Sequence, residues 1–324
     1  MIHRSNCLIA SPALLAIVVP CFNEDAVLAD TARQLSAVLS MLIANNKVDH
    51  ASFIYFVDAG SKDSTWRLIE KMHSKNPIVK GLKLAHNAGH QSALLAGMLT
   101  LIDKVDFIIS VDADLQDDIS TIEPMVDEYL RGCDVVFGVR KNRDTDTFFK
   151  KKSAQAFYKL MTTMGVDIID NHADYRLLSK RALKALSEFK ERNLFLRGIV
   201  PQLGFKTSTI YYNRLIRKAG VSKYNLRRML SFAFDGITSF SIVPLRMITA
   251  LGFLVSLGSL AISFWVLAAY LFGLTVPGWT STVLPIYFIG GVQLLSIGLI
   301  GEYIGKIYNE VKARPRYIIE EEIF

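Results

Sequence analysis

The sequence predicts an α/β fold in which a mostly parallel sheet, covered by helices on both faces, precedes a helical membrane segment. Short apolar runs alternate with helical patterns over residues 14–137, and a polar cluster follows each of the first four runs. Residues 247–301 contain no Asp, Glu, Lys, Arg or His. The alternation is typical of βαβ units, and an uncharged stretch of this length is typical of transmembrane helices.

Five apolar runs have the length and the β-branched and aromatic composition of buried strands. They are Leu14–Val19, Phe53–Val57, Val79–Leu84, Phe107–Val111 and Val135–Phe137. The helical patterns between them are Ala26–Ala44, Ser64–Ser74, Gln91–Ile102 and Ile119–Leu130. Because the carboxyl ends of parallel strands share one edge of a sheet, a ligand site is expected at the loops that follow these strands.

The loops after the first four strands carry the polar residues of this expected site. They contain Asn23 and Glu24, then residues 58–63, 87–90 and 112–117. Four loops with such side chains at one edge of a sheet predict a binding or catalytic centre.

Asp112, Asp114 and Gln116 alternate along the chain, so on an extended backbone their oxygens face one direction. Mg²⁺ and Mn²⁺ prefer oxygen ligands and are usually bound by one or two carboxylates together with substrate phosphates. The loop therefore predicts a divalent cation and a nucleotide-diphosphate substrate. A solvated acidic turn is the alternative, and the strand in front of the loop favours the site.

Two apolar segments, Met247–Phe272 and Ser281–Ile300, flank a short connection at Gly273–Thr280. At about 1.5 Å per residue, each is long enough to cross the roughly 30 Å hydrocarbon core of a bilayer. A hairpin of two transmembrane helices is therefore expected, with a buried helical pair of a soluble domain as the alternative. Basic residues lie outside both ends and none lies in the connection, so the positive-inside rule places both termini in the cytoplasm.

The segment before the hairpin has apolar residues at three- and four-residue spacing, among them Leu226, Met229 and Leu230, with Arg227 and Arg228 elsewhere on the helical wheel. This pattern predicts an amphipathic helix that lies in the membrane interface. An ordinary core helix is the alternative.

The formal net charge is +7, and much of the basic excess borders the apolar hairpin. Anionic lipid headgroups attract Lys and Arg, so a membrane surface rather than nucleic acid is the expected partner. The three cysteines, Cys7, Cys21 and Cys133, have no metal-ligand spacing and are interpreted as reduced thiols of a cytosolic domain. The apolar run at 14–19 is too short for a signal-peptide core.

Three motifs resemble the family 2 glycosyltransferases of the GT-A fold: residues 18–24 (Val-Val-Pro-Cys-Phe-Asn-Glu), 58–63 (Asp-Ala-Gly-Ser-Lys-Asp) and 112–117 (Asp-Ala-Asp-Leu-Gln-Asp). Further motifs are similar to those of the polyprenyl-phosphate glycosyltransferases, which include bactoprenol glucosyltransferases and relatives of dolichyl-phosphate mannose synthase. These motifs lie at residues 174–178, 191–193, 235–240 and 301–305.

The resemblance implies that a hexose is transferred with inversion from a nucleotide sugar, with UDP-glucose as the first candidate, to undecaprenyl phosphate. The reaction would take place at the cytoplasmic face of a bacterial inner membrane and would supply lipid-linked sugar for cell-surface glycans. A separate flippase is then expected, and a homo-oligomer is possible in such a family. Neither the sugar, nor the base, nor the choice between Mg²⁺ and Mn²⁺ can be read from these residues.

The resemblance also assigns roles to individual residues. The nucleotide sugar would lie against Pro20, Asn23, Glu24, Asp58 and Asp112, and the metal against Asp112, Asp114 and Gln116. Two departures from the family pattern are Ala59, where relatives usually have a second Asp, and His90, where Lys is common.

A lipid monophosphate needs positioning by cations rather than a general base, because its second pKa is about 6 and it is largely dianionic at neutral pH. The candidates for holding it are Arg140, Arg143, Lys151, Lys152 and Arg176. Asp114, Arg140 and Arg176 are therefore the expected catalytic residues.

Two other functions are open. A processive polysaccharide synthase usually carries a Gln-x-x-Arg-Trp motif, and none of Trp66, Trp265 and Trp279 has that context. An inactive transferase-fold scaffold in the membrane is disfavoured by the complete acidic loop. The expected organisation is a cytoplasmic GT-A domain at 1–222, an amphipathic juxtamembrane helix at 223–245, two transmembrane helices within 246–305 (about 247–272 and 281–301) and a cytoplasmic basic tail at 306–324.

Overall fold

The computed structural model describes residues 12–141, 172–191, 196–213, 243–272 and 278–324. The chain divides into two compact units. The first is an α/β unit that contains the whole sheet, and the second contains the two long helices near the C-terminus.

The α/β unit is built on an eight-stranded mixed sheet with the order β7-β5-β6-β4-β1-β2-β3-β8. Strands β1 to β4 form its parallel centre, and β6 and β8 each run antiparallel to their neighbours. The strands are β1 (Leu15–Cys21), β2 (Phe53–Asp58), β3 (Val79–Leu84), β4 (Phe107–Ser110), β5 (Val135–Arg140), β6 (His172–Ser179), β7 (Thr207–Tyr212) and β8 (Ile319–Ile323).

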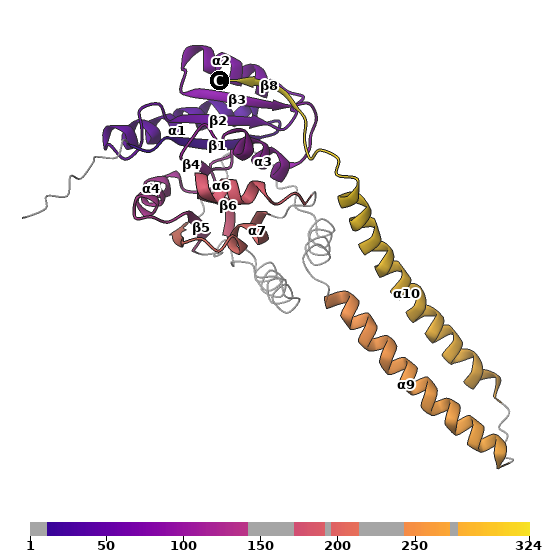
Figure 1. Cartoon of the computed structure of the whole chain (residues 1–324). Helices are drawn as coiled ribbons and strands as arrows, with labels where there is room; N and C mark the ends of the chain where they lie inside the picture. Colours follow the sequence, from indigo (N-terminus) through magenta and orange to yellow (C-terminus); the bar gives the residue numbers. More distant parts are fainter. Residues whose placement is uncertain (1–11, 142–171, 192–195, 214–242, 273–277) are drawn as a thin grey trace, which may run out of the picture. The chain divides into compact units, whose positions relative to one another are not determined.

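Helices cover both faces of this sheet (Figure 1). The helices of the unit are α1 (Asp25–Ala44), α2 (Thr65–Lys75), α3 (His90–Thr100), α4 (Ile122–Leu130) after the 3₁₀ turn η1 (Ile119–Thr121), α6 (Lys180–Ser187) and α7 (Leu196–Gln202). Because side chains alternate along a strand, Leu15 and Ile17 of β1 join one core cluster with Leu28 and Leu35 of α1.

On the opposite face α3 packs unusually close to the sheet at Gly97. A Cβ atom at this position would lie 2.6 Å from Val57 Cγ2 and 2.8 Å from Val18 Cγ1, so any larger residue would push the helix away. Helix α3, which begins at His90, therefore lies against β1 and β2.

The prediction of an α/β fold with a largely parallel centre is confirmed. The expected strands and helices up to α3 match the observed ones to within two residues at either end. The helix expected at Ile119–Leu130 is divided into the 3₁₀ turn η1 and α4, and β5 continues to Arg140 instead of ending at Phe137. Strands β6, β7 and β8 were not predicted. Strand β8 contains three consecutive glutamates, Glu320 to Glu322, and so lacks the apolar pattern that identifies a buried strand.

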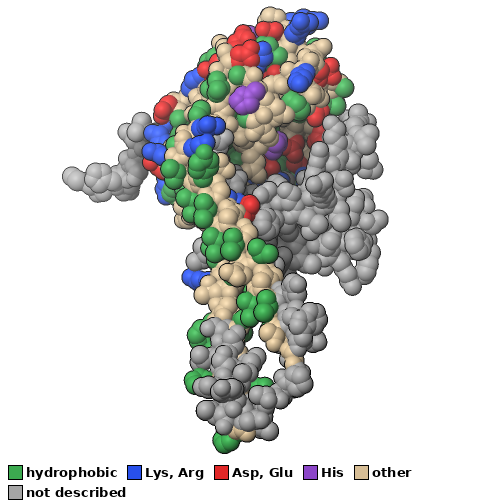
Figure 2. All heavy atoms as spheres, turned by 90° about the vertical axis from the view of Figure 1, so that its right-hand side faces the viewer, with side chains coloured by type: hydrophobic (Ala, Val, Ile, Leu, Met, Phe, Trp, Pro, Cys, Tyr) green, Lys and Arg blue, Asp and Glu red, His purple; other side chains and the backbone are tan. Residues whose placement is uncertain are grey.

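The second unit contains α9 (Val243–Leu271) and α10 (Trp279–Val311). Large apolar side chains are exposed along both helices, including Phe253, Leu254, Phe264 and Leu294, each at more than three-fifths of its full area. Figure 2 shows such hydrophobic side chains along the described parts of this unit. Soluble proteins rarely expose so much contiguous apolar surface.

By length and composition alone, two of the described helical stretches could cross a membrane: Asp25–Ala44 and Phe288–Val311. The first is α1, whose apolar side is buried against the sheet, so it is a core helix of the α/β unit. The second lies in α10 and has no buried residues. The predicted amphipathic helix at 223–245 and the basic loop with Arg143, Lys151 and Lys152 fall almost wholly outside the described residues.

The end of the chain returns to the α/β unit as β8, which pairs antiparallel with the edge strand β3. Glu322 Oε1 accepts hydrogen bonds from the buried Tyr55 hydroxyl at 2.8 Å and from Lys104 Nζ at 2.6 Å. The ring of Phe324 meets the ring of Phe53 edge to face, with 5.3 Å between centroids. The segment therefore belongs to the α/β unit and covers an edge of its sheet that would otherwise expose unpaired backbone groups.

We expect Glu322→Ala to destabilise the α/β unit more than Glu320→Ala does. The first change leaves the Tyr55 hydroxyl, which is fully buried, without its acceptor, at a cost of about 1–3 kcal/mol. The second removes the exposed pair with Lys83, worth at most about 1 kcal/mol. Thermal unfolding of the full-length protein in detergent measures both, and equal melting temperatures for the two variants would contradict a structural role for β8.

Candidate active site

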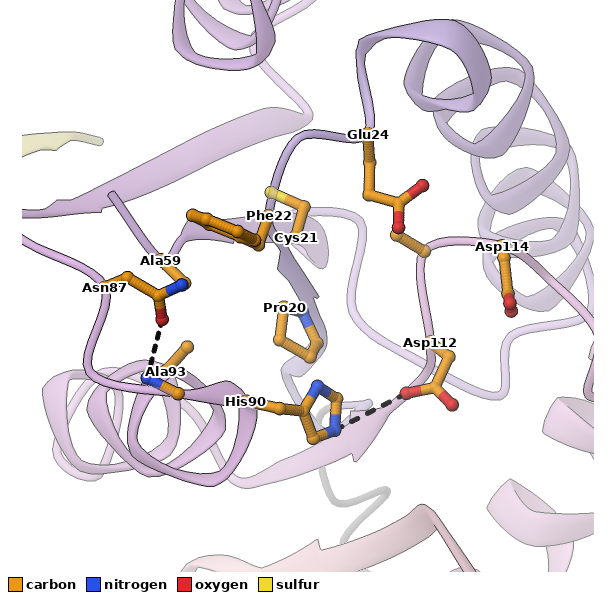
Figure 3. Close-up of a pocket in the computed structure, with 12 residues that line it drawn as sticks. Pro20, Cys21, Phe22, Glu24, Ala59, Asn87, His90, Ala93, Asp112 and Asp114 are labelled. Carbon is orange, nitrogen blue, oxygen red and sulfur yellow. Dashed lines mark hydrogen bonds and ion pairs between the residues drawn. The ribbon is translucent and has the colours of Figure 1, made fainter. Parts of the chain in front are cut away.

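A cavity of about 320 Å³ opens at the carboxyl ends of β1, β2 and β4, beside the N-terminus of α3. This is the edge at which open α/β sheets bind their ligands. The cavity is lined by Pro20, Cys21, Phe22, Glu24, Ala59, Asn87, Gly89, His90, Ala93, Asp112, Ala113 and Asp114. In Figure 3, Glu24, Asp112 and Asp114 lie on one side of the cavity, and Ala59 and Asn87 lie on the other.

The loops after β1 and β2 are held together by hydrogen bonds around Asn23. Its backbone N–H donates to Ser61 Oγ at 2.9 Å, and its side-chain oxygen accepts from the Lys62 N–H at 2.9 Å. The Glu24 N–H donates to Thr65 Oγ1 at 3.0 Å. These contacts fix the direction in which Glu24 enters the cavity.

Asp58 lies at the end of β2 and is fully buried. Its Oδ1 accepts hydrogen bonds from the Ser61 N–H at 2.9 Å and the Ser61 hydroxyl at 2.5 Å, whereas Oδ2 has no partner among the described residues. Burial raises the pKa of Asp58 despite these bonds. Ala59, which replaces the expected second carboxylate, lines the cavity, and Gly60 (φ +76°) makes the turn, where a Cβ would lie 2.7 Å from the backbone of His86.

The acidic loop after β4 brings Asp112 and Asp114 to the cavity (Figure 3). Burial raises the pKa of Asp112 to about 6; His90 opposes this rise, and the carboxylates of Asp117, Asp174 and Asp114 add to it. A cation bound between the carboxylates would relieve this repulsion. The donor chemistry therefore fits Mg²⁺ or Mn²⁺.

No group of three His, Cys, Asp or Glu side chains within the described ranges is arranged to hold a metal unaided. A cation at Asp112 and Asp114 would thus take its remaining ligands from substrate phosphates and water, as Mg²⁺ sites usually do. The third expected ligand, Gln116, is buried and does not line the cavity, and its N–H donates to Asp114 Oδ1 at 3.3 Å.

A buried ion cluster centred on Asp174 of β6 lies next to the acidic loop. Asp174 Oδ1 accepts from Arg176 Nη2 at 2.5 Å, and Oδ2 accepts from Arg197 Nη2 at 3.0 Å. His90 Nε2 lies 3.5 Å from Asp174 Oδ2 and 3.6 Å from Asp112 Oδ1. Burial alone would raise the pKa of Asp174, but Arg197, His90 and Arg176 hold it well below its ordinary value.

Arg140 ends β5 and is bound to the buried Asp117. Its Nη2 and Nε donate to Asp117 Oδ1 at 2.9 and 3.1 Å, and the Tyr212 hydroxyl donates to the same oxygen at 2.7 Å. Arg140 keeps 26% of its side-chain area exposed. Asp117 thus joins the acidic loop to the end of β5.

The structure brings together only some of the site residues expected from the sequence. Pro20, Glu24, Asp112 and Asp114 line the cavity, and Asn23 and Asp58 support its walls. Arg176 differs from the expectation, because its side chain is fully buried and its Nη1 and Nη2 donate to Leu196 O and Asp174. This burial does not fit direct contact with an acceptor phosphate.

Sequence reasoning did not assign Asp117, Asp174, Tyr212 and Arg197 to the site. Asp117 and Asp174 stand inside the motifs at 112–117 and 174–178 and could have been suspected from them. Tyr212 and Arg197 carry no local signal, because only the pairing of β7 with β5 and the position of α7 beside β6 bring them close.

The sequence pattern of glycosyl transferase family 2 matches residues 16–187. The chain belongs to this family. It is a glycosyltransferase of the GT-A-like α/β type, and the matched range contains the cavity with both aspartates of the acidic loop.

Relatives match nearly the whole chain. The glycosyltransferase YkoT of Bacillus subtilis (strain 168), described as uncharacterized, is 50% identical over 97% of this chain and 93% of its own length. A protein named bactoprenol glucosyl transferase from Shigella phage SfII is 37% identical over 95% of this chain and 97% of its own length.

Solved structures match this chain with lower sequence identity. Mannosyl-3-phosphoglycerate synthase from Rubrobacter xylanophilus has a TM-score of 0.44 and 14% identity, covering 74% of this chain and 75% of its own. The mannosyltransferase PcManGT from Pyrobaculum calidifontis, solved in complex with GDP-Man and Mn²⁺, has a TM-score of 0.41 and 14% identity, covering 89% and 88% of the two chains.

We expect Asp114→Asn to abolish metal-dependent sugar transfer in a protein that still folds. The amide keeps an oxygen for the Gln116 N–H but removes the anionic ligand that a hard cation prefers. The loss should exceed the roughly 10–100-fold effects seen when residues one step further from a metal are changed.

Asp118→Asn is the matched control. Asp118 stands in the same loop and caps η1 through the Ser120 N–H, yet it does not line the cavity. Transfer assays over a range of Mn²⁺ concentrations should show near-normal activity for the control, and normal activity of Asp114→Asn would contradict the metal assignment.

Proposed function

We propose that this protein transfers glucose from UDP-glucose, with inversion, to undecaprenyl phosphate at the cytoplasmic face of a bacterial inner membrane. The observation that carries the proposal is the cavity in which Asp112 and Asp114 face the loops after β1 and β2. The 37% identity to a protein named bactoprenol glucosyl transferase, over 95% of the chain, supports the choice of sugar and lipid acceptor.

The donor would occupy the cavity with its nucleoside toward Pro20, Asp58 and Ala59 and its diphosphate toward Asp112 and Asp114. Mg²⁺ or Mn²⁺ held by these two aspartates would supply Lewis-acid stabilisation of the diphosphate leaving group. Pro20 and Ala59 support this orientation because both line the cavity, and Asp58 lies at the end of β2 directly before Ala59.

The acceptor needs no general base on the protein. A polyprenyl monophosphate is largely dianionic at neutral pH, since the second pKa of a phosphate ester is about 6. Attack from the face opposite the leaving diphosphate inverts the anomeric carbon. The requirement that remains is a cation that holds two phosphate groups near each other, and Arg140, fixed by Asp117 and still partly exposed, is suited to this role. Arg143, Lys151 and Lys152 are further proposed contacts.

We further propose that α9 and α10 form the transmembrane hairpin, with spans at about 247–272 and 281–301. The exposed apolar side chains of both helices support this reading, because lipid is the solvent that favours such a surface. The catalytic unit would then lie in the cytoplasm, beside the polar end of the lipid acceptor. The lipid-linked glucose formed there would need a separate flippase to reach the other side.

We expect membranes that contain this protein to transfer radiolabelled glucose from UDP-glucose to undecaprenyl phosphate. The product should be extractable into organic solvent, should depend on Mg²⁺ or Mn²⁺, and should be absent with Asp114→Asn. UDP-N-acetylglucosamine, UDP-galactose and GDP-mannose should be assayed in parallel. Label in a growing polymer without a lipid intermediate would favour a processive synthase, and no transfer from any of the four donors would favour an inactive scaffold.

We expect the connection between the helices to be the one segment outside the cytoplasm. A single cysteine at Thr280, with Cys7, Cys21 and Cys133 replaced, should react with an impermeant maleimide in intact cells, and one at Asn309 should react only after permeabilisation. Labelling of position 309 in intact cells, or protection of position 280 in both conditions, would contradict the hairpin topology.

A further inference from the structure

We propose that His90 is a positioning residue that holds the Asp112 carboxylate ready for the donor's metal ion, and that Asp174 anchors His90. The inference rests on the proposed function, because it takes Asp112 as a metal ligand. It assigns a role to a cavity-lining histidine and to the ion cluster next to the acidic loop.

The first support is geometric. His90 projects from the N-terminus of α3 into the cavity toward Asp112 (Figure 3). A single atom, Nε2, lies 3.6 Å from Asp112 Oδ1 and 3.5 Å from Asp174 Oδ2. The imidazole is therefore the side chain that bridges the acidic loop to the buried cluster.

The second support is the rigidity of both ends of this bridge. Asp174 is 92% buried and is fixed by Arg176 and Arg197, which come from β6 and α7. His90 begins α3, which packs closely against β1 and β2 at Gly97. A ring held between two rigid elements can fix the orientation of a loop carboxylate.

The third support is the balance of charge. The negative charges of Asp114, Asp117 and Asp174 repel that of Asp112. The charge of a protonated His90 opposes them at Asp112, and the Arg176 guanidinium also interacts with Asp112. Residues that orient a metal ligand without touching the metal typically change metal affinity by about 10–100-fold when they are removed.

The test is calorimetric binding of UDP, with GDP in parallel, to the full-length protein in detergent. Each titration is made once with Mn²⁺ and once with EDTA. His90→Ala should weaken nucleotide binding about 10–100-fold in Mn²⁺ and leave the weak binding in EDTA unchanged. His90→Gln, whose Nε2 is the same number of bonds from Cβ, should recover part of the loss.

His50→Ala is the matched control, because His50 is exposed on the surface far from the cavity lining and lies beside the neighbouring Asp49, 3.2 Å from its Oδ1. It should behave as the wild-type protein does. Melting temperatures of all variants separate a binding defect from unfolding.

Equal binding by His90→Ala and the wild-type protein in Mn²⁺ would overturn the inference. An equal loss in Mn²⁺ and in EDTA would overturn it as well, because it would show that His90 contacts the nucleotide directly. If the wild-type protein bound neither nucleotide in a Mn²⁺-dependent way, the proposed function itself would fall, and this inference with it.

Discussion

The geometry of the site depends on one buried carboxylate, that of Asp174. Removing a carboxylate from water costs several kcal/mol unless cations and hydrogen bonds replace the lost hydration, by the order-of-magnitude estimates for buried ions. Here Arg176 and Arg197 replace that hydration, and His90 adds a third positive or hydrogen-bonding group. Because these partners come from β6, α7 and α3, the same ion cluster sets the relative positions of three elements around the cavity.

This arrangement engages an arginine and an aspartate of one motif, Arg176 and Asp174, with each other. Arg176 is fully buried, and it is occupied by Asp174 and the Leu196 carbonyl. Arg140, in contrast, stays partly exposed while Asp117 and Tyr212 hold it in place. A buried carboxylate thus binds each of the two described arginines among the candidates, Asp174 for Arg176 and Asp117 for Arg140.

Unsatisfied polar atoms also gather around the site. Four buried side-chain polar atoms have no partner among the described residues, and three of them belong to Asp58, Asp117 and Arg176. Native proteins normally give buried polar atoms a hydrogen-bond partner. Buried polar atoms without a partner are therefore expected mainly at functional sites. At the β3 edge of the sheet, by contrast, β8 pairs with the backbone of β3, and Glu322 accepts a hydrogen bond from the buried Tyr55 hydroxyl.

The sequence by itself determined the parallel centre of the sheet, helices α1 to α4 and the acidic loop with Asp112 and Asp114. These features rest on local periodicity and on residue types at the ends of strands, which a short window of sequence displays. The tertiary structure decided the burial of Arg176, the role of Asp117, the bridge through His90 and the pairing of β8. Each of these depends on contacts between distant segments, such as the 267 residues that separate Tyr55 from Glu322, and no local pattern encodes which distant partner will neutralise a buried charge or cover an open edge.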